Sequence, residues 1–154
     1  MLSTVAEIKR RGVTQDRLGA PYGNCVEAVL ATLLDIRIEA VPDLREGAKL
    51  HGLAKDEIDQ VMMLRKSALR RWLAEKHDVL WIEGPAVNGG PKLPPLEWNA
   101  LPLVWIAAGP SPRGLRHVVI CVDEQLAWDP HPDRSGLLDV ESWGMLIPLG
   151  TPKP

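Results

Sequence analysis

The chain has 154 residues, 45% of them apolar and 25% charged, and its formal net charge at pH 7 is −2. This length suits one domain with one core, so we expect residues 1–154 to fold as a unit, with a frayed tail from Thr151 onward. The near-neutral charge, without a basic or acidic tail, removes the electrostatic case for nucleic acid or an anionic membrane as a partner.

No apolar run approaches the ~18–20 residues of a transmembrane helix. Charged residues also interrupt the N-terminal stretch where a signal peptide would lie. Two cysteines, Cys25 and Cys121, do not make a disulfide framework. We therefore expect a cytoplasmic protein in a reducing setting.

In chain order, the first expected element is a short helix that includes Val5 and Ile8, followed by a turn near residues 19–21. Apolar residues at helical spacing predict a helix over residues 25–35. A second apolar stripe, with charged residues between its members, predicts a helix over residues 56–76.

The second half of the chain alternates short apolar segments with turns rich in proline and glycine. These turns predict a long loop over residues 84–100 and a tight one over residues 109–114. Helices precede strands, which predicts an α+β fold in which the helix that begins at Cys25 packs on a mostly antiparallel sheet. The expected strands cover residues 79–82, 103–107, 117–122 and 126–129, with a further strand or short helix within residues 137–149.

Cys25 opens its predicted helix. Asn24 is a favoured N-cap residue, and Glu27 stands at the position of a capping box. The sulfur would then lie where free backbone N–H groups favour an anion, which is one way in which the pKa of a thiol falls and its reactivity rises. The alternative is that Cys25 is simply a small buried apolar residue, as most free cysteines are.

His117 and Asp129 form a second pattern. Alternation along the strand puts His117 on the same face as Val119 and Cys121. A hairpin of odd loop length centred on Asp123 would place Asp129 directly opposite His117, within reach of an imidazole nitrogen. A histidine oriented by an acid, with its other nitrogen free, has the geometry of a general base. Taken singly, His117 also fits a satisfied strand end and Asp129 a turn residue before proline.

The order of these residues resembles the papain-like cysteine peptidase superfamily, especially its compact bacterial branch that cleaves double-glycine leader peptides. The matching stretches are Asn24-Cys25, His117 to Ile120 and Trp128-Asp129-Pro130, and the turns at 109–114 and 129–132 resemble small bacterial and phage proteins of this kind. The resemblance implies a papain-like fold with Cys25 as nucleophile, His117 as base and Asp129 as the group that orients the base.

The family's oxyanion-hole glutamine usually precedes the cysteine by about six residues, where this chain has Gly19. Gln15, ten residues before Cys25, and the Asn24 side chain are therefore the expected oxyanion donors, beside the Cys25 backbone N–H. Losing one such donor typically costs a factor of ~10²–10³ in rate. Gln15 placed at the site would favour an enzyme, and its absence would favour a binding module.

The sequence thus predicts a thiol hydrolase of peptide or isopeptide bonds in protein or peptide substrates, acting through an acyl-enzyme without a cofactor. We expect Arg113, Trp128 and His131 to contact the substrate, with His131 exposed between two prolines. A metal site is not expected, because Cys25, His117, Asp129 and His131 lack paired ligand spacing.

Three alternatives remain at this point. Deamidation of glutamine side chains, or acyl transfer, uses the same acyl-enzyme chemistry. An inactive papain-like protein would instead bind a partner protein through its tryptophans. The third alternative is an unrelated α+β protein whose three residues coincide by chance. The sequence does not indicate an oligomeric state.

Overall fold

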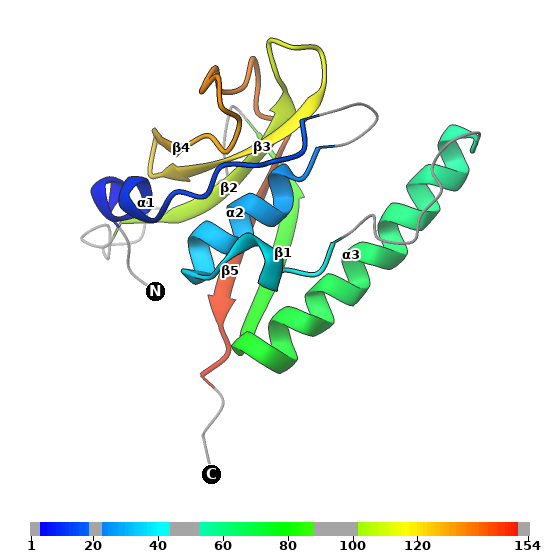
Figure 1. The fold of residues 1–154 in the computed structure, drawn as a ribbon, viewed down its shortest axis with the longest axis horizontal. Helices are drawn as coiled ribbons and strands as arrows, with labels where there is room; N and C mark the ends of the chain where they lie inside the picture. The colour runs from blue at the N-terminus through cyan, green and yellow to red at the C-terminus, as the bar shows by residue number, and fades with distance from the viewer. Residues whose placement is uncertain (1–3, 19–22, 44–52, 88–101, 151–154) are drawn as a thin grey trace.

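The computed structural model describes residues 4–18, 23–43, 53–87 and 102–150. Within these ranges, helices occupy the first half of the chain and strands the second (Figure 1). The helices are α1 (Val5–Arg11), α2 (Cys25–Leu34) and α3 (Lys55–His77), with a short 3₁₀ helix at Ile38–Ala40. The strands are β1 (Val79–Pro85), β2 (Val104–Pro110), β3 (Arg116–Val122), β4 (Gln125–Trp128) and β5 (Ser142–Pro148).

The five strands form one sheet in the order β1-β5-β2-β3-β4, and every neighbouring pair is antiparallel. In Figure 1, α2 lies in front of this sheet, and α3 lies beside β1. α2 contacts β3, α3 contacts β1 and α1 contacts β4. The predicted α+β fold, with a helix packed on an antiparallel sheet, is confirmed.

Local sequence explains the helix ends. Thr4 and Glu7 form a capping box that starts α1, because each side chain accepts the other's backbone N–H. α2 is apolar on nearly every side, so tertiary burial holds it in place, and it ends where Asp35 adopts a left-handed conformation with φ of 56°. α3 likewise ends at a residue in the left-handed conformation, Asp78, with φ of 53°.

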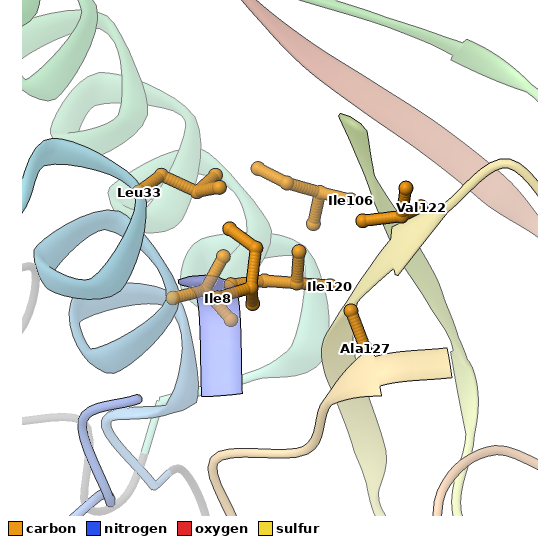
Figure 2. Packing of buried hydrophobic residues seen from close by; sticks show 7 residues of the cluster. Ile8, Leu33, Ile106, Ile120, Val122 and Ala127 are labelled. Carbon is orange, nitrogen blue, oxygen red and sulfur yellow. The ribbon is translucent and has the colours of Figure 1, made fainter. Parts of the chain in front are cut away.

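The sheet separates two apolar regions. On one face, α1 and α2 pack against β2, β3 and β4, and Figure 2 shows Ile8 and Leu33 directed toward Ile120. A second cluster on this side joins α2 to α3 through Leu30, Leu73 and other residues. On the opposite face, Val119 and Cys121 pack with residues of the segment that leads into β5. Alternate residues of β3 therefore face opposite layers, and this division determines where His117 points.

A β-bulge interrupts the β3–β4 hairpin. Cys121 lies opposite Leu126, but Ile120 lies opposite Trp128, so Ala127 is the extra residue. Ala127 and Trp128 consequently both belong to the layer beneath α1, and the residue after them turns to the other face. The bulge reverses the alternation one residue before Asp129.

Several boundaries differ from those predicted. β1 continues to Pro85, into the region predicted as a loop, because Gly84 and Pro85 pair with Trp143 and Ser142 of β5. The chain after residue 136 forms a strand, with no helix in the described part. The 3₁₀ helix was not predicted. The predicted turn at residues 19–21, most of the loop at 84–100 and the tail from Thr151 lie outside the described residues.

No helix within the described ranges is both long enough and apolar enough to cross a bilayer.

Candidate functional site

Cys25 is the first residue of α2, as predicted, and it is partly buried. Its sulfur receives a hydrogen bond from the backbone N–H of Val118 in β3, and the N–H groups of Val26 and Cys25 also face it. Burial raises the pKa of the thiol from 9.0 to about 11; the nearby Glu27 adds to the rise, and the three N–H groups oppose it. The expectation that the helix start lowers this pKa is therefore wrong for this arrangement, because desolvation outweighs the N–H groups.

Asn24 does not cap α2 through its side chain. Its Oδ1 accepts the backbone N–H of Arg17 at 3.0 Å, and its Nδ2 donates to Asp16 Oδ1 at 2.6 Å. The predicted capping box is therefore wrong, because the side chain instead binds the irregular segment before the helix. Asn24 is buried, and it fastens residues 16–17 against the start of α2.

His117 and Asp129 meet as predicted. His117 Nε2 lies 2.7 Å from Asp129 Oδ1, and the two side chains are 3% and 1% exposed. Asp129 also accepts the backbone N–H of His131 at Oδ1 and that of Gly136 at Oδ2, at 2.8 Å and 2.7 Å. Burial would raise the pKa of Asp129, but the bond to His117 and these two N–H groups hold it below its usual value. The carboxylate is thus ionised near neutral pH and fixes the imidazole.

The predicted reason for this contact is wrong, although the contact itself is present. Asp129 does not lie directly opposite His117, because β4 ends at Trp128 and the bulge at Ala127 shifts the register. Without the extra residue, Asp129 would point to the helix-covered face. The bulge turns it to the face of His117, which is a common use of bulges near sites.

Cys25 and His117 both lie next to the peptide bond that links His117 to Val118, but on opposite faces of β3. Val118 faces the layer of α2, so its neighbour His117 starts from the opposite face of β3. The Cys25 sulfur is bonded at the Val118 N–H, which belongs to the peptide that links His117 to Val118. No hydrogen bond joins Cys25 to His117, both of which are among the described residues. His117 Nδ1 likewise has no protein partner within the described ranges.

Gln15 lies against the approach to α2. It is 5% exposed, and its Nε2 donates to the Arg17 backbone oxygen at 2.9 Å. Gly23 stands two residues before Cys25, and a Cβ added there would lie 2.6 Å from this Nε2. Only glycine at this position therefore leaves room for the Gln15 side chain. The Gln15 backbone N–H donates to the Pro130 oxygen at 2.9 Å, and its Oε1 is buried with no hydrogen-bond partner in the described part of the chain. Gln15 is therefore at the site's edge, bridging the α2 approach and the Asp129 loop.

Arg134 fastens the loop that follows β4, residues 129–136 (the Asp129 loop), and no periodic pattern in the sequence indicated this role. Its Nη1 donates to the backbone oxygens of Asp129 and His131 at 2.6 Å and 2.8 Å, and its Nη2 donates to Thr14 Oγ1 at 2.8 Å. Its guanidinium also lies 4.1 Å from the centre of the Trp128 ring. In the sequence, Arg134 is marked only by its place in a turn-rich stretch after Asp129.

Trp128, one of the predicted substrate contacts, makes structural contacts here. Its indole N–H donates to the Val13 oxygen at 3.0 Å, and its ring would meet a Cβ at Gly12 at 2.6 Å. With Arg134 on the ring, most of this side chain is used within the protein. A substrate contact by Trp128 stays a prediction.

The other two predicted substrate contacts meet at Asp133. Arg113 Nη1 donates to both carboxylate oxygens of Asp133, at 2.8 Å and 2.9 Å, and to Ser135. His131 Nδ1 accepts the Asp133 backbone N–H at 3.1 Å. The expected exposure of His131 is wrong, since its side chain is only 14% exposed, and its ring centre lies 6.1 Å from that of His117. The structure thus brings His131, but not Trp128, beside His117.

Within the described ranges, no three His, Cys, Asp or Glu side chains are grouped so as to hold a metal ion. An apolar pocket also exists between β2 and β5, with Leu33, Trp105 and Met145 in its wall. It lies at the end of β2 remote from Gly109, the partner of His117. It therefore does not belong to the Cys25 region.

Comparisons with protein families, with curated proteins and with solved structures found no match to this chain.

Proposed function

We propose that the protein is a cysteine-dependent hydrolase of papain-like type that cleaves peptide or isopeptide bonds. The observation that carries this proposal is the position of Cys25, whose sulfur is hydrogen-bonded to the backbone N–H of the residue that follows His117. The buried Asp129 holds the Nε2 of His117 at 2.7 Å. The bond to Asp129 leaves Nδ1 as the nitrogen available to a thiol. Catalytic hydrogen bonds are often long in a resting site and tighten when substrate binds.

In the proposed reaction, Cys25 Sγ attacks the amide carbon and its proton passes to His117 Nδ1. His117 then protonates the leaving amine as the carbon–nitrogen bond breaks, which leaves an acyl group on sulfur. A water molecule, deprotonated by His117, attacks the thioester carbonyl, and release of the acid returns the proton to Cys25. Asp129 keeps Nε2–H bonded throughout and stabilises the imidazolium, as an acid does in other triads.

The oxyanion that forms on the carbonyl needs donors in place before the reaction. The backbone N–H of Cys25, at the start of α2, is one proposed donor. Gln15 is the second, because it is buried beside Gly23 and has an N–H left after its bond to the Arg17 oxygen. The Asn24 side chain is already bonded to Asp16 and Arg17, so we assign it a supporting part.

Hydrolysis of a glutamine side-chain amide would follow the same steps, with ammonia as the leaving group. A single experiment separates these reactions. The protein is incubated with peptide, isopeptide and glutamine-containing libraries, and products are read by mass spectrometry, with Cys25→Ala and His117→Ala as controls. Cleavage gives new termini, whereas deamidation adds about 1 Da. Turnover that survives in Cys25→Ala, or none in any library, would contradict the proposal.

A second candidate is favoured by one observation. Cys25 has a pKa raised to about 11 and makes no hydrogen bond with His117, as expected of a papain-like protein that binds a partner without turnover. The tryptophans that the sequence suggests as contacts with a partner protein give this candidate little support, since Trp81 and Trp105 are buried in the core. Trp98 lies outside the described residues. Binding of a peptide by wild type and Cys25→Ala alike, without any product, would favour this candidate.

A further inference from the structure

Two histidines lie side by side at the candidate site. The His117 and His131 ring centres are 6.1 Å apart, and the ring planes are nearly perpendicular, at 86°. The proposed reaction uses only His117. His131 is 14% exposed, so it is neither in the core nor free on the surface.

The position of His131 is fixed by its neighbours in the chain. Pro130 and Pro132 restrict the backbone on both sides, and Pro130 is fully buried. The His131 N–H donates to Asp129 Oδ1 at 2.8 Å, and the His131 oxygen accepts from Arg134 at 2.8 Å. The ring is therefore presented by a rigid loop, which is a condition for selective binding.

Hydrogen bonding also assigns the protons on the ring. Nδ1 accepts the backbone N–H of Asp133 at 3.1 Å, so the proton of the neutral ring is on Nε2. If the ring gains a proton, Nδ1 faces Asp133 Oδ1 at 2.9 Å, and Nε2 still carries its hydrogen. Nε2–H is thus a donor in both states, and no hydrogen bond uses it within the described residues.

Two carboxylates lie beside His131: Asp129 is bonded to His117 and to backbone N–H groups, and Asp133 is paired with an arginine. Arg113 binds both oxygens of Asp133, so this carboxylate does not stand as an unpaired negative charge beside the ring. An anion near Nε2 would therefore meet an N–H donor without facing a free carboxylate from Asp133. A hydrogen bond to a charged oxygen is roughly twice as strong as one between neutral groups.

Contacts also connect His131 to the nucleophile. Gln15 contacts the backbone of Pro130 on one side and lies against Gly23 on the other. The His117 ring lies 6.1 Å from that of His131, and the Cys25 sulfur is bonded at the N–H of the next residue, Val118. Two sets of contacts thus connect the His131 loop with the surroundings of Cys25.

From this arrangement we propose that His131 Nε2–H is a specificity-determining donor that selects substrates with a carboxylate beside the bond to be cleaved. This inference rests on the proposed function, because it assumes that Cys25 is the reacting group. It names a substrate class, namely peptides with an acidic side chain or a free terminal carboxylate next to the scissile amide.

The test uses two alkylating agents of similar size, iodoacetate and iodoacetamide, which differ in charge. Their rate constants at Cys25 are measured at one pH by peptide mapping, for wild type, His131→Leu and His131→Gln. Glutamine keeps an N–H donor close to the Nε2 position, whereas leucine has none. His77→Leu, which removes a histidine from the far end of α3, is the matched control.

We expect the iodoacetate-to-iodoacetamide ratio to fall about 3- to 10-fold in His131→Leu, and to stay near that of wild type in His131→Gln and His77→Leu. An unchanged ratio in His131→Leu would overturn the proposal. Should His131→Leu fail to fold, a ratio in His131→Gln that falls well below that of His77→Leu would also overturn it.

The two proposals fail in different ways. If Cys25 alkylation does not depend on His117, the hydrolase proposal fails and this inference fails with it. If alkylation depends on His117 but the ratio is insensitive to His131, only the inference is overturned. If the ratio does depend on His131, matched peptides that end in a free acid or an amide separate a terminal carboxylate from an acidic side chain as the group selected.

Discussion

The two cysteines are both desolvated, but they differ in the polar groups around the sulfur. Burial raises the pKa of both Cys25 and Cys121 to about 11. For Cys121, in the middle of β3, desolvation is the only cause. For Cys25, the same burial is opposed by three backbone N–H groups, including that of Val118.

The pKa of a thiol alone therefore does not identify it as a nucleophile. The surroundings of Cys121 are apolar, and nothing there would stabilise a thiolate. The surroundings of Cys25 already contain donors, so contact with a protonated His117 would shift its equilibrium strongly.

Replacing Asp129 with alanine should have the largest effect on both stability and Cys25. It leaves His117 and the N–H groups of His131 and Gly136 without their acceptor, so we expect a loss of about 3 kcal/mol in the free energy of unfolding. Alkylation of Cys25 should slow, while that of Cys121 in the folded protein should not change. Urea unfolding and peptide mapping measure the two effects, and equal changes at both cysteines would contradict the comparison.

Gly23→Ala should disturb the approach to Cys25 alone. The new Cβ would lie 2.6 Å from Gln15 Nε2 and 2.7 Å from the Arg17 oxygen, so both must move, at a cost of about 1–3 kcal/mol. Gly114→Ala is the matched control, since its Cβ has open space and only its φ of 81° is unfavourable, costing about 1 kcal/mol. Urea unfolding compares the two, and a smaller loss in Gly23→Ala would show that Gln15 is not packed there.

The raised pKa of Cys121 predicts a loss of stability in alkali. A thiol with a folded pKa of about 11 and an unfolded pKa near 9.0 stabilises the protein fully below pH ~9, and this contribution disappears as the pH rises through about 11. The free energy of unfolding should therefore decline less steeply in Cys121→Ala, by about 1–2 kcal/mol over this window. Parallel pH profiles for wild type and variant would contradict the burial of Cys121.

The smallest effect is expected at Asp133, which is an exposed counterpart of Asp129. Its ion pair with Arg113 is accessible to solvent, so Asp133→Asn should lower the free energy of unfolding by less than any of the changes above. Below pH ~4 the difference between Asp129→Asn and Asp133→Asn should shrink, because Asp129, with its lowered pKa, stabilises the protein above its unfolded pKa of ~3.9 and loses this contribution as the pH falls. Asp129→Asn should therefore flatten the acid side of the stability profile more than Asp133→Asn.

Much of the fold could be predicted, because apolar periodicity is a local signal. It placed α2 and α3 within a residue or two of their observed ends, and the order of elements gave the antiparallel sheet. The contact of His117 with Asp129 was also predictable from the hairpin. The register was not, because the extra residue at Ala127 leaves no mark in an apolar-polar pattern.

The chemical surroundings of the site could not be predicted from neighbours in sequence. Asn24 has the identity of a cap, yet Asp16 and Arg17, seven or eight residues away, take its side chain. The desolvation of Cys25 depends on packing between α2 and β3, which no local pattern records. Arg134 joins Thr14 to the Asp129 loop across most of the chain, so its importance emerges only in three dimensions.

The most direct test of the account is the rate of Cys25 alkylation by iodoacetamide against pH, in wild type and in His117→Ala, with peptide mapping to separate Cys25 from Cys121. Burial alone gives Cys25 a pKa of about 11; if the two residues act as a pair, the apparent pKa in wild type will lie below this value and will be higher in His117→Ala than in wild type. An apparent pKa near 11 in both proteins would contradict the account and leave Cys25 as a buried thiol like Cys121.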